Sequence, residues 1–426
     1  MIKSPDQMKF KKLFFFIFFV SICIVLALKI EKYLYQDKLV KIFVLSFLAF
    51  FFITCFFLYE KYSKYLKIIF FNFIIIIYSL NFLFGFYFLK YSIDNRQKQE
   101  LKKLGINYDS RTQLEYIKDY SDKLFPMITP REIMQKESFL ILSNISNSKY
   151  VQCNEYGHWK LISTDKYGFN NSNLKKGYKI LLSGDSFAHG FCVDENKEIH
   201  KILISKGIDT YSVGIAGNGP LISLSSMIEI NKKINFDEIY WLIYRNDFFD
   251  LNWELENKYL KKYLNSSFNG FNYFDNLELK NSYQEKFISE NKNQKKNFSY
   301  KESFFELKFL NDVIKKIFIE KNELELNDKY IKQILKVFSI KFPKIKKTIV
   351  YLPSYNCFEN ETLLCKMEYD LLNKISGDLN IKTINFKNYI DDKNFRKIFA
   401  LELNGLHYSD LGYSKLANII YEEYLK

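Results

Sequence analysis

The chain has 426 residues, enough for two or three domains with a large buried core. It is rich in apolar and aromatic residues, at 48% and 18%, and carries a formal net charge of +14. The lysines are scattered and accompany no nucleic-acid-binding motif or glycine-rich phosphate loop, so the charge does not indicate a nucleic-acid-binding protein. With four histidines and no Cys-x-x-Cys pair, a Cys/His zinc site is not expected.

Three apolar runs open the chain, at 13–28, 42–59 and 68–89. A helix of about 20 apolar residues spans the hydrocarbon core of a bilayer, and about 17 are tolerated. The second and third runs satisfy this length, and the first does if its flanking lysines snorkel. The runs therefore predict three transmembrane helices within residues 1–90. A cleaved signal peptide is the alternative for the first run, but the residues at its end do not form the small-x-small pattern of a cleavage site.

Four cysteines lie outside the apolar runs: Cys153, Cys192, Cys357 and Cys365. Their even number and paired location predict two disulfides, Cys153–Cys192 and Cys357–Cys365, which require an oxidising compartment. The lysines on the two sides of the apolar runs do not decide the orientation. We therefore expect a multi-pass protein of the plasma (inner) membrane whose polar domain lies outside the cytoplasm. Four unrelated thiols in a cytosolic domain are the alternative.

The polar part of the chain divides into three stretches. Residues 91–150 are expected to form a juxtamembrane connector, and residues 151–426 one large domain. From residue 178 onward, short apolar strands alternate with helices, which predicts a parallel sheet with helices on both faces, a three-layer α/β/α domain. The alternation breaks at about 250–328, which we interpret either as an inserted cap or as a partly disordered surface insertion.

Four short segments with reactive or donor groups follow the expected strands. The first strand ends in Gly184-Asp185-Ser186, where a serine at a strand-to-helix turn presents its hydroxyl at the edge of the sheet. Alone this motif is weak, because an ordinary helix N-cap has the same sequence. Later segments add a glycine-rich turn at 214–219, the amide of Asn246 and the imidazole of His407. A nucleophile, oxyanion donors and a base at one sheet edge satisfy the requirements of acyl transfer.

In this order, the segments resemble the blocks of the SGNH/GDSL hydrolase family, over roughly residue 178 to the end. The Gly-Asp-Ser block matches 184–186, and the Gly-x-x-Gly turn matches 214–217. The Gly-x-Asn-Asp block appears at 244–247 with Tyr244 in place of its glycine. The resemblance implies a flavodoxin-like fold with Ser186 as nucleophile and His407 as general base. It also implies an oxyanion hole built from the N–H groups of Ser186 and Gly217 and the side chain of Asn246.

The last block departs from the family pattern, because Asp-x-x-His appears as Asn404-Gly405-Leu406-His407. In the family this aspartate orients the imidazole and stabilises the imidazolium, whereas an asparagine supplies no charge. Three outcomes remain open. Asn404 orients His407 in a slower Ser-His dyad, or Glu402 or Asp410 replaces the aspartate, or the domain is inactive. A Cys153–Cys192 bridge would also hold residues 150–159 against the rim of the site, since Cys192 lies six residues after Ser186.

The resemblance implies a membrane-anchored serine esterase that acts on carboxyl esters. The expected substrate is an ester-bearing molecule of the cell envelope, such as an acylated glycan or lipid. No metal or organic cofactor is implied, and no protein partner is predicted. Two alternatives remain: an O-acetyltransferase of an envelope glycan, and a catalytically silent module that binds glycans.

Overall fold

The computed structural model describes residues 13–24, 39–120, 123–135, 139–171, 174–291, 300–318, 320–359, 363–391 and 393–426. The chain forms two compact units. The first contains Met1–Ser92 together with Lys296–Asn322, and the second contains Ile93–Lys295 together with Glu323–Lys426. Each unit is described by itself below.

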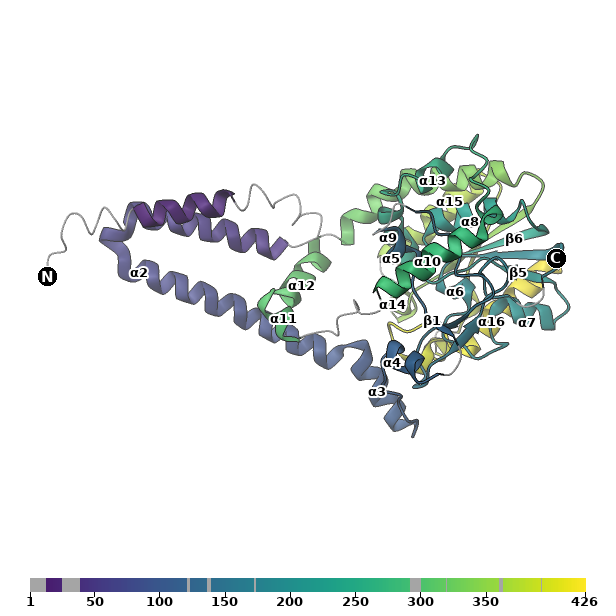
Figure 1. Ribbon diagram of the computed structural model, residues 1–426, viewed down its shortest axis with the longest axis horizontal. Helices are drawn as coiled ribbons and strands as arrows, with labels where there is room; N and C mark the ends of the chain where they lie inside the picture. The colour runs from purple at the N-terminus through teal and green to yellow at the C-terminus, as the bar shows by residue number, and fades with distance from the viewer. Residues whose placement is uncertain are drawn as a thin grey trace. The chain divides into compact units, whose positions relative to one another are not determined.

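The first unit is built on the long helix α2 (Leu39–Tyr91), which is kinked at Tyr62 (Figure 1). The kink brings the two arms together, and the rings of Phe47 and Phe73 stack with their centroids 3.4 Å apart. Within the described residues, one helix, Lys64–Tyr87, is long and apolar enough to cross a membrane. The other apolar helices of this unit, Leu13–Ile24 and Ile42–Phe57, are shorter. Of the three expected membrane-spanning helices, one is therefore supported within the described residues, and residues 25–28 of the first run lie outside them.

Two helices from a distant part of the sequence complete this unit. They are α11 (Tyr300–Phe305) and α12 (Lys308–Phe318). Asn81 of α2 is fully buried beneath the turn between them. Its side chain donates to the Phe304 carbonyl at 2.9 Å and accepts from the Leu310 N–H at 3.0 Å. Both polar functions of a buried amide are thereby satisfied, which fixes this turn to the apolar helix.

The second unit contains a five-stranded parallel sheet, in the order β5-β4-β6-β7-β8. Numbered along the chain, these strands follow the order 2-1-3-4-5 of flavodoxin-like sheets. The predicted α/β domain with a parallel sheet is thus confirmed. The strands are β4 (Gly177–Ser183), β5 (Thr210–Ser212), β6 (Asn235–Tyr244), β7 (Lys346–Leu352) and β8 (Lys382–Asn385).

Helices cover both faces of this sheet. Alternate residues of each strand point to opposite sides, and apolar residues on both sides are buried beneath the helices. Leu181 and Trp241 belong to one buried cluster, whereas Ile180 and Leu242 belong to another. Buried residues of α8, α13 and α15 join the first cluster, and those of α7 and α16 join the second. The bounds of these helices are α7 (Ile199–Ser205), α8 (Pro220–Ile230), α13 (Glu320–Lys341), α15 (Leu363–Asp378) and α16 (Asp410–Tyr424).

The stretch expected to be a connector is instead part of the second unit. Its strands β1 and β2 pair with β3 in a small separate sheet, and Ile133 and Leu142 are buried in the main core. Because these apolar side chains pack in the core of the domain, the segment is part of the domain and not a linker. Its elements are α3 (Ile93–Lys103), α4 (Gln113–Lys118), β1 (Leu124–Pro126), α5 (Pro130–Met134), β2 (Lys149–Val151) and β3 (Leu161–Ser163).

The region expected to form an inserted cap is divided between the two units. Its first part contributes Trp253, Tyr263 and Phe287 to the main core of the second unit. The part from Lys296 to Asn322 belongs to the first unit. The elements of the first part are α9 (Arg245–Glu254), η1 (Leu260–Leu264), η2 (Tyr273–Asp275) and α10 (Leu277–Asn291).

Candidate active site

The expected nucleophile lies at the turn between β4 and α6 (Ser186–His189). Asp185 precedes this turn of helix and accepts a hydrogen bond from the Phe187 N–H at 3.0 Å. Gly184 has φ +145°, and a Cβ there would lie 2.7 Å from the Leu242 carbonyl oxygen of the neighbouring strand. A glycine is therefore needed for the close approach of the turn to the sheet. The turn holds Ser186 at the carboxyl edge, with 8% of its surface exposed.

His407 meets this serine from the loop before α16. Its Nε2 lies 3.0 Å from Ser186 Oγ, within the hydrogen-bond reach expected from the sequence. The loop is closed by a hydrogen bond from the Ala400 N–H to the His407 carbonyl at 2.8 Å. The rings of Phe187 and Phe191 lie 5.4 Å and 4.7 Å from the imidazole, centroid to centroid. These contacts leave the ring little freedom to turn away from the serine.

The other nitrogen of the imidazole faces a carboxylate that the sequence did not single out. Glu155 Oε1 lies 2.6 Å from His407 Nδ1, and Glu155 Oε2 accepts from the His407 backbone N–H at 3.2 Å. A carboxylate at Nδ1 favours the tautomer with the proton on that nitrogen, which leaves Nε2 free to accept the Ser186 proton. The order Ser186, His407, Glu155 thus has the connectivity of a catalytic triad.

The expectation that Asn404 orients the ring is wrong. The Asn404 amide instead donates to Asn356 Oδ1 at 2.7 Å, on α14 (Tyr355–Glu359). In the part of the chain that the structure describes, neither Glu402 nor Asp410 contacts the imidazole. The substitution at the last family block is thus accompanied by a carboxylate from a different part of the chain.

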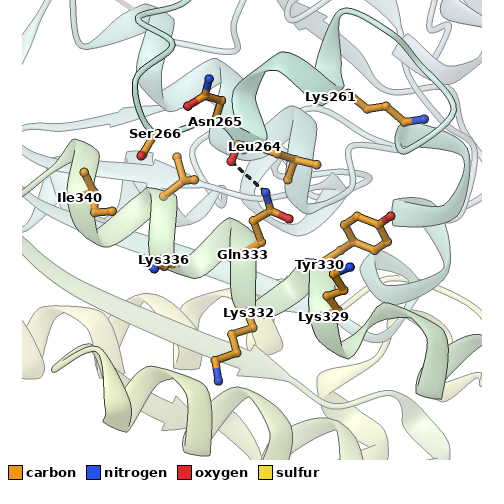
Figure 2. Close-up of a pocket in the computed structure, with 11 residues that line it drawn as sticks. Lys261, Leu264, Asn265, Ser266, Lys329, Tyr330, Lys332, Gln333, Lys336 and Ile340 are labelled. Atoms are coloured by element: carbon orange, nitrogen blue, oxygen red, sulfur yellow. Dashed lines mark hydrogen bonds between the residues drawn. The ribbon is translucent and has the colours of Figure 1, made fainter.

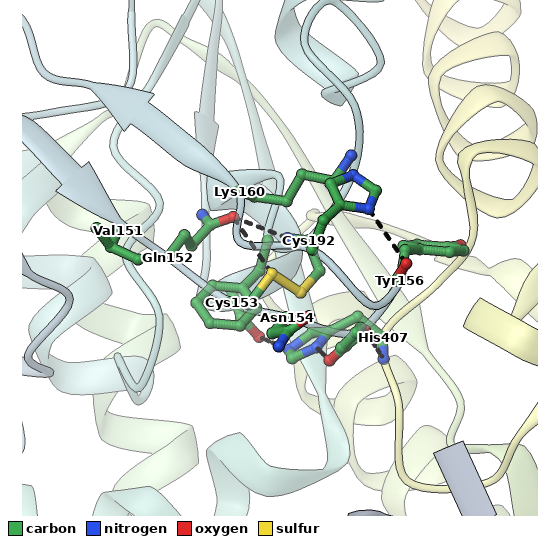
Figure 3. Close-up of a disulfide and its surroundings, with 12 residues drawn as sticks. Val151, Gln152, Cys153, Asn154, Tyr156, Lys160, Cys192 and His407 are labelled. Atoms are coloured by element: carbon green, nitrogen blue, oxygen red, sulfur yellow. Dashed lines mark hydrogen bonds and ion pairs between the residues drawn. A yellow bond between two sulfur atoms is a disulfide. The ribbon is translucent and has the colours of Figure 1, made fainter. Parts of the chain in front are cut away.

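Both expected disulfides are present. The Cα atoms are 5.7 Å apart in Cys153–Cys192 and in Cys357–Cys365. The first bridge joins the loop after β2, which carries Glu155, to the segment after α6, and Figure 3 shows it near His407. Gln152 Oε1 reinforces it by accepting from the Cys192 N–H at 2.8 Å. Because Glu155 follows Cys153 by two residues, the predicted disulfide was the signal in the sequence that could have identified this carboxylate.

The charges around His407 favour its protonated form. Burial alone would lower the pKa of His407, but the adjacent Glu155 carboxylate, with a smaller contribution from Asp185, raises it above its ordinary value. Burial in turn raises the pKa of the Asp185 carboxyl. A negative charge at Nδ1 stabilises the imidazolium that forms when the serine proton is taken. The site therefore has the electrostatics of a general base that is easily protonated.

The two other expected oxyanion donors lie on the turns after β5 and β6. Gly217 has φ +80°, and a Cβ there would lie 2.9 Å from Thr129 Cγ2, so the glycine fits a turn packed against the start of α5. Asn246 lies in the first turn of α9, and its Nδ2 donates to Asp250 Oδ2 at 3.0 Å. The Asn246 side chain also forms a hydrogen bond with the Asp185 carboxylate. The oxyanion roles of Gly217 and Asn246 remain predictions.

A cavity lies elsewhere in the second unit, between η1 and α13 (Figure 2). It has a volume of about 860 Å³ and is lined in part by Lys261, Lys329, Lys332 and Lys336. Its wall is tied together by a hydrogen bond from Gln333 Nε2 to the Leu264 carbonyl at 3.1 Å. Its lining includes none of the site residues. Among the described residues, no group of His, Cys, Asp and Glu side chains is placed to hold a metal ion.

Comparisons with known proteins find similarity in two solved structures. One is a lipase/acylhydrolase from Enterococcus faecalis, at 12% identity and a TM-score of 0.30. The other is a family 3 carbohydrate esterase from Clostridium thermocellum, at 14% identity and a TM-score of 0.30. Each alignment covers 58% of this chain and 94% of the other. No family model and no curated protein sequence matches the chain. Similarity at this level carries no argument about activity, so the function rests on the geometry of the site.

Proposed function

We propose that the second unit is a serine ester hydrolase of the SGNH/GDSL type. The observation that carries the proposal is the continuous contact from Ser186 through His407 to Glu155, at 3.0 Å and 2.6 Å. In this proposal Ser186 is the nucleophile, His407 is the general base, and Glu155 orients and charges the ring. These contacts support the proposal because acyl transfer requires a base within hydrogen-bond reach of the nucleophile and a group that orients the base.

The reaction follows from this geometry. Ser186 Oγ attacks the carbonyl carbon of an ester while its proton passes to His407 Nε2. The N–H groups of Ser186 and Gly217 and the Asn246 amide stabilise the resulting oxyanion. Collapse of the tetrahedral intermediate breaks the ester bond, and the leaving alcohol takes the proton from His407. Water then attacks the acyl-serine, again giving a proton to His407, and the carboxylic acid and free serine are released.

The enzyme is proposed to act outside the cytoplasm, anchored to the plasma membrane by Lys64–Tyr87. Two disulfides support an oxidising compartment. One crossing of the bilayer separates the N-terminus from the second unit as effectively as the three crossings expected from the sequence. The proposed substrate is therefore an ester-bearing molecule of the cell envelope, an acylated glycan or lipid.

The structure bears differently on the two alternatives to hydrolysis, a silent glycan-binding module and an O-acetyltransferase. The silent glycan-binding module was suggested by the missing carboxylate at Asn404, and Glu155 removes that reason. Transfer to a sugar hydroxyl would use the same acyl-enzyme with a different acceptor in place of water. Analysis of the products with and without an added glycan acceptor distinguishes the two reactions.

The test is labelling of the full-length chain in detergent with a fluorophosphonate, which reacts with activated serines. We expect the wild type to be labelled, and Ser186→Ala to lose both labelling and hydrolysis of p-nitrophenyl acetate. Ser205→Ala is the matched control, because Ser205 is exposed and its hydroxyl donates to the Ile202 carbonyl of its own helix. A folded wild type without labelling, or equal labelling of Ser186→Ala, would refute the proposal.

A further inference from the structure

The helix α3 is the first element of the second unit, and it lies against two loops of the candidate site. In the chain it follows the apolar helix α2 almost directly, since α2 ends at Tyr91 and α3 begins at Ile93. Two adjacent side chains, Arg96 and Gln97, make its polar contacts to these loops. One loop carries Glu155 and the other carries His407.

Gln97 holds the loop that carries the acid. Its Nε2 donates to the carbonyl oxygens of Asn154 at 2.5 Å and Glu155 at 3.0 Å. Only 6% of Gln97 is exposed, so these bonds form away from solvent competition. Below it, fully buried Leu101 packs against the backbone at Gly157, where an added Cβ would lie 3.3 Å from Leu101 Cδ1. Glu155 is therefore fixed at its backbone by α3 and at its carboxylate by His407.

Arg96 holds the loop that carries the base. Its Nη2 donates to the Asn404 carbonyl at 2.8 Å, three residues before His407. Ile93 packs against the next residue, since a Cβ on Gly405 would lie 3.4 Å from Ile93 Cδ1. Gly405 has φ +98°, so the loop adopts a sharp conformation at the point where α3 contacts it. Two consecutive residues of α3 thus contact the loop that carries His407 (the base loop) and the loop that carries Glu155 (the acid loop).

We propose that Arg96 and Gln97 are positioning residues that keep the Glu155 loop and the His407 loop in register. The inference rests on the proposed function and deepens it. Neither loop is a strand or a helix at these residues, so the 2.6 Å contact between Glu155 and His407 depends on how the two backbones are held. A misplacement of about 1 Å in a catalytic group can lower a rate about 10²-fold. The competence of the site thereby depends on the helix that follows the apolar anchor.

The proposal is tested with the full-length chain, comparing Gln97→Met and Arg96→Met with Gln99→Met and Lys98→Met. The controls lie on the same helix, and their side chains are exposed. We expect kcat to fall roughly 10- to 100-fold in the first pair, with KM changed by less than about threefold, because chemistry is impaired rather than binding. The controls keep the wild-type kcat. Arg96→Lys retains a donor and should recover part of the activity lost in Arg96→Met.

A second readout separates positioning from simple destabilisation. The chain has four histidines, and burial lowers the pKa of His189 and His200 to about 3. These two imidazoles should therefore stay neutral near pH 7 and not obscure the His407 signal in an NMR titration of labelled histidine. Glu155 raises the pKa of His407, so release of the acid loop in Gln97→Met should move that pKa down. A loss of stability alone would leave it unchanged.

The outcomes are distinct. If Gln97→Met matches Gln99→Met both in kcat and in the His407 pKa, the inference is overturned while the proposed hydrolase stands. If the wild type has no esterase activity and no labelled serine, the proposed function fails and the inference fails with it. Should Gln97→Met unfold, the pair Arg96→Met and Arg96→Lys decides the question, because an equal loss in both would show that the donated hydrogen bond does not matter.

Discussion

The two regions that build the site differ in how their positions are determined. Ser186 follows a strand of the parallel sheet, and His407 lies in the loop before the last helix that covers it. Such positions follow from the regular alternation of strands and helices. Glu155 comes from the segment before the sheet, and its place is set by a disulfide and by side-chain hydrogen bonds. The comparison teaches that a regular sheet can place the proposed nucleophile, while a loop outside that sheet supplies the carboxylate proposed to activate it through His407.

The sharpest way to test this comparison is to remove the charge contributed by the irregular segment. Glu155→Gln keeps a hydrogen-bonding side chain but no longer stabilises the imidazolium. By analogy with the loss of the triad aspartate in a serine protease, kcat on a short-chain ester should fall about 10⁴-fold. Glu402→Gln is the control and should retain wild-type activity. A Glu155→Gln enzyme within tenfold of the wild type would show that the carboxylate is dispensable.

The next largest effect is expected at the sheet edge itself. Asn246→Ala removes a proposed oxyanion donor and should lower kcat about 10²- to 10³-fold with little change in KM. Asn246 also donates to Asp250, so Asp250→Ala, which removes the acceptor, serves as a control for the loss of that contact. Equal losses in the two variants would mean that the contact, and not the oxyanion, explains the effect of Asn246→Ala.

The two disulfides allow a comparison within one protein. They close separations of 39 and 8 residues, for which chain entropy predicts stabilisations of about 4 and about 2.5 kcal/mol. Both double Cys→Ser variants should therefore melt at lower temperature. Only Cys153→Ser with Cys192→Ser should also lose activity, by about tenfold, because that bridge holds the acid loop near the nucleophile. Equal kcat values in the two variants at a temperature where both are folded would contradict this.

A smaller effect concerns the pH dependence of the wild type and Glu155→Gln. The general base must be unprotonated, so kcat/KM should rise with pH through the pKa of His407. Because Glu155 raises that pKa, the wild-type rise should be centred above the ordinary histidine value of 6.5. Residual activity in Glu155→Gln should rise at lower pH than in the wild type. If kcat/KM rises at the same pH in the wild type and in Glu155→Gln, Glu155 does not affect the pKa of His407.

The smallest effect is expected at Asn404. Its amide faces Asn356 and not the imidazole, so Asn404→Asp should change kcat by less than about twofold. Steady-state hydrolysis of a short-chain ester by the two proteins is sufficient. A tenfold increase in the variant would revive the view that this position is an impaired catalytic residue.

Part of this architecture could be predicted from the sequence because it depends on local patterns. The parallel sheet follows from apolar strands alternating with helices, and the contact between Ser186 and His407 follows from matched strand-end segments. The cysteine pairs could be predicted from their number and location outside the apolar runs. In each case the determining residues lie close to the feature that they specify.

Other features were not predicted because they depend on long-range contacts. Glu155 lies 252 residues from His407 and outside the segments that match the family blocks, so the predicted Cys153–Cys192 bridge was the available signal for it. The anchoring of Ile133 and Leu142 in the main core has no periodic signature, so the segment before the sheet was interpreted as a connector. Composition alone also does not show that α2 bends at Tyr62, between the second and third apolar runs.

The pairing of Asn81 with the α11–α12 turn bears on how the second unit could be shed by proteolysis. The chain passes between the two units three times, after residues 92, 295 and 322. A single cut near Ser92 leaves the second unit covalently joined to Lys296–Asn322, which remains bound to the apolar helix through Phe304 and Leu310. Release of the second unit would require further cuts or the loss of the hydrogen bonds between Asn81 and this turn. If the apolar helix is the proposed membrane anchor, this contact would keep the second unit at the membrane after such a cut.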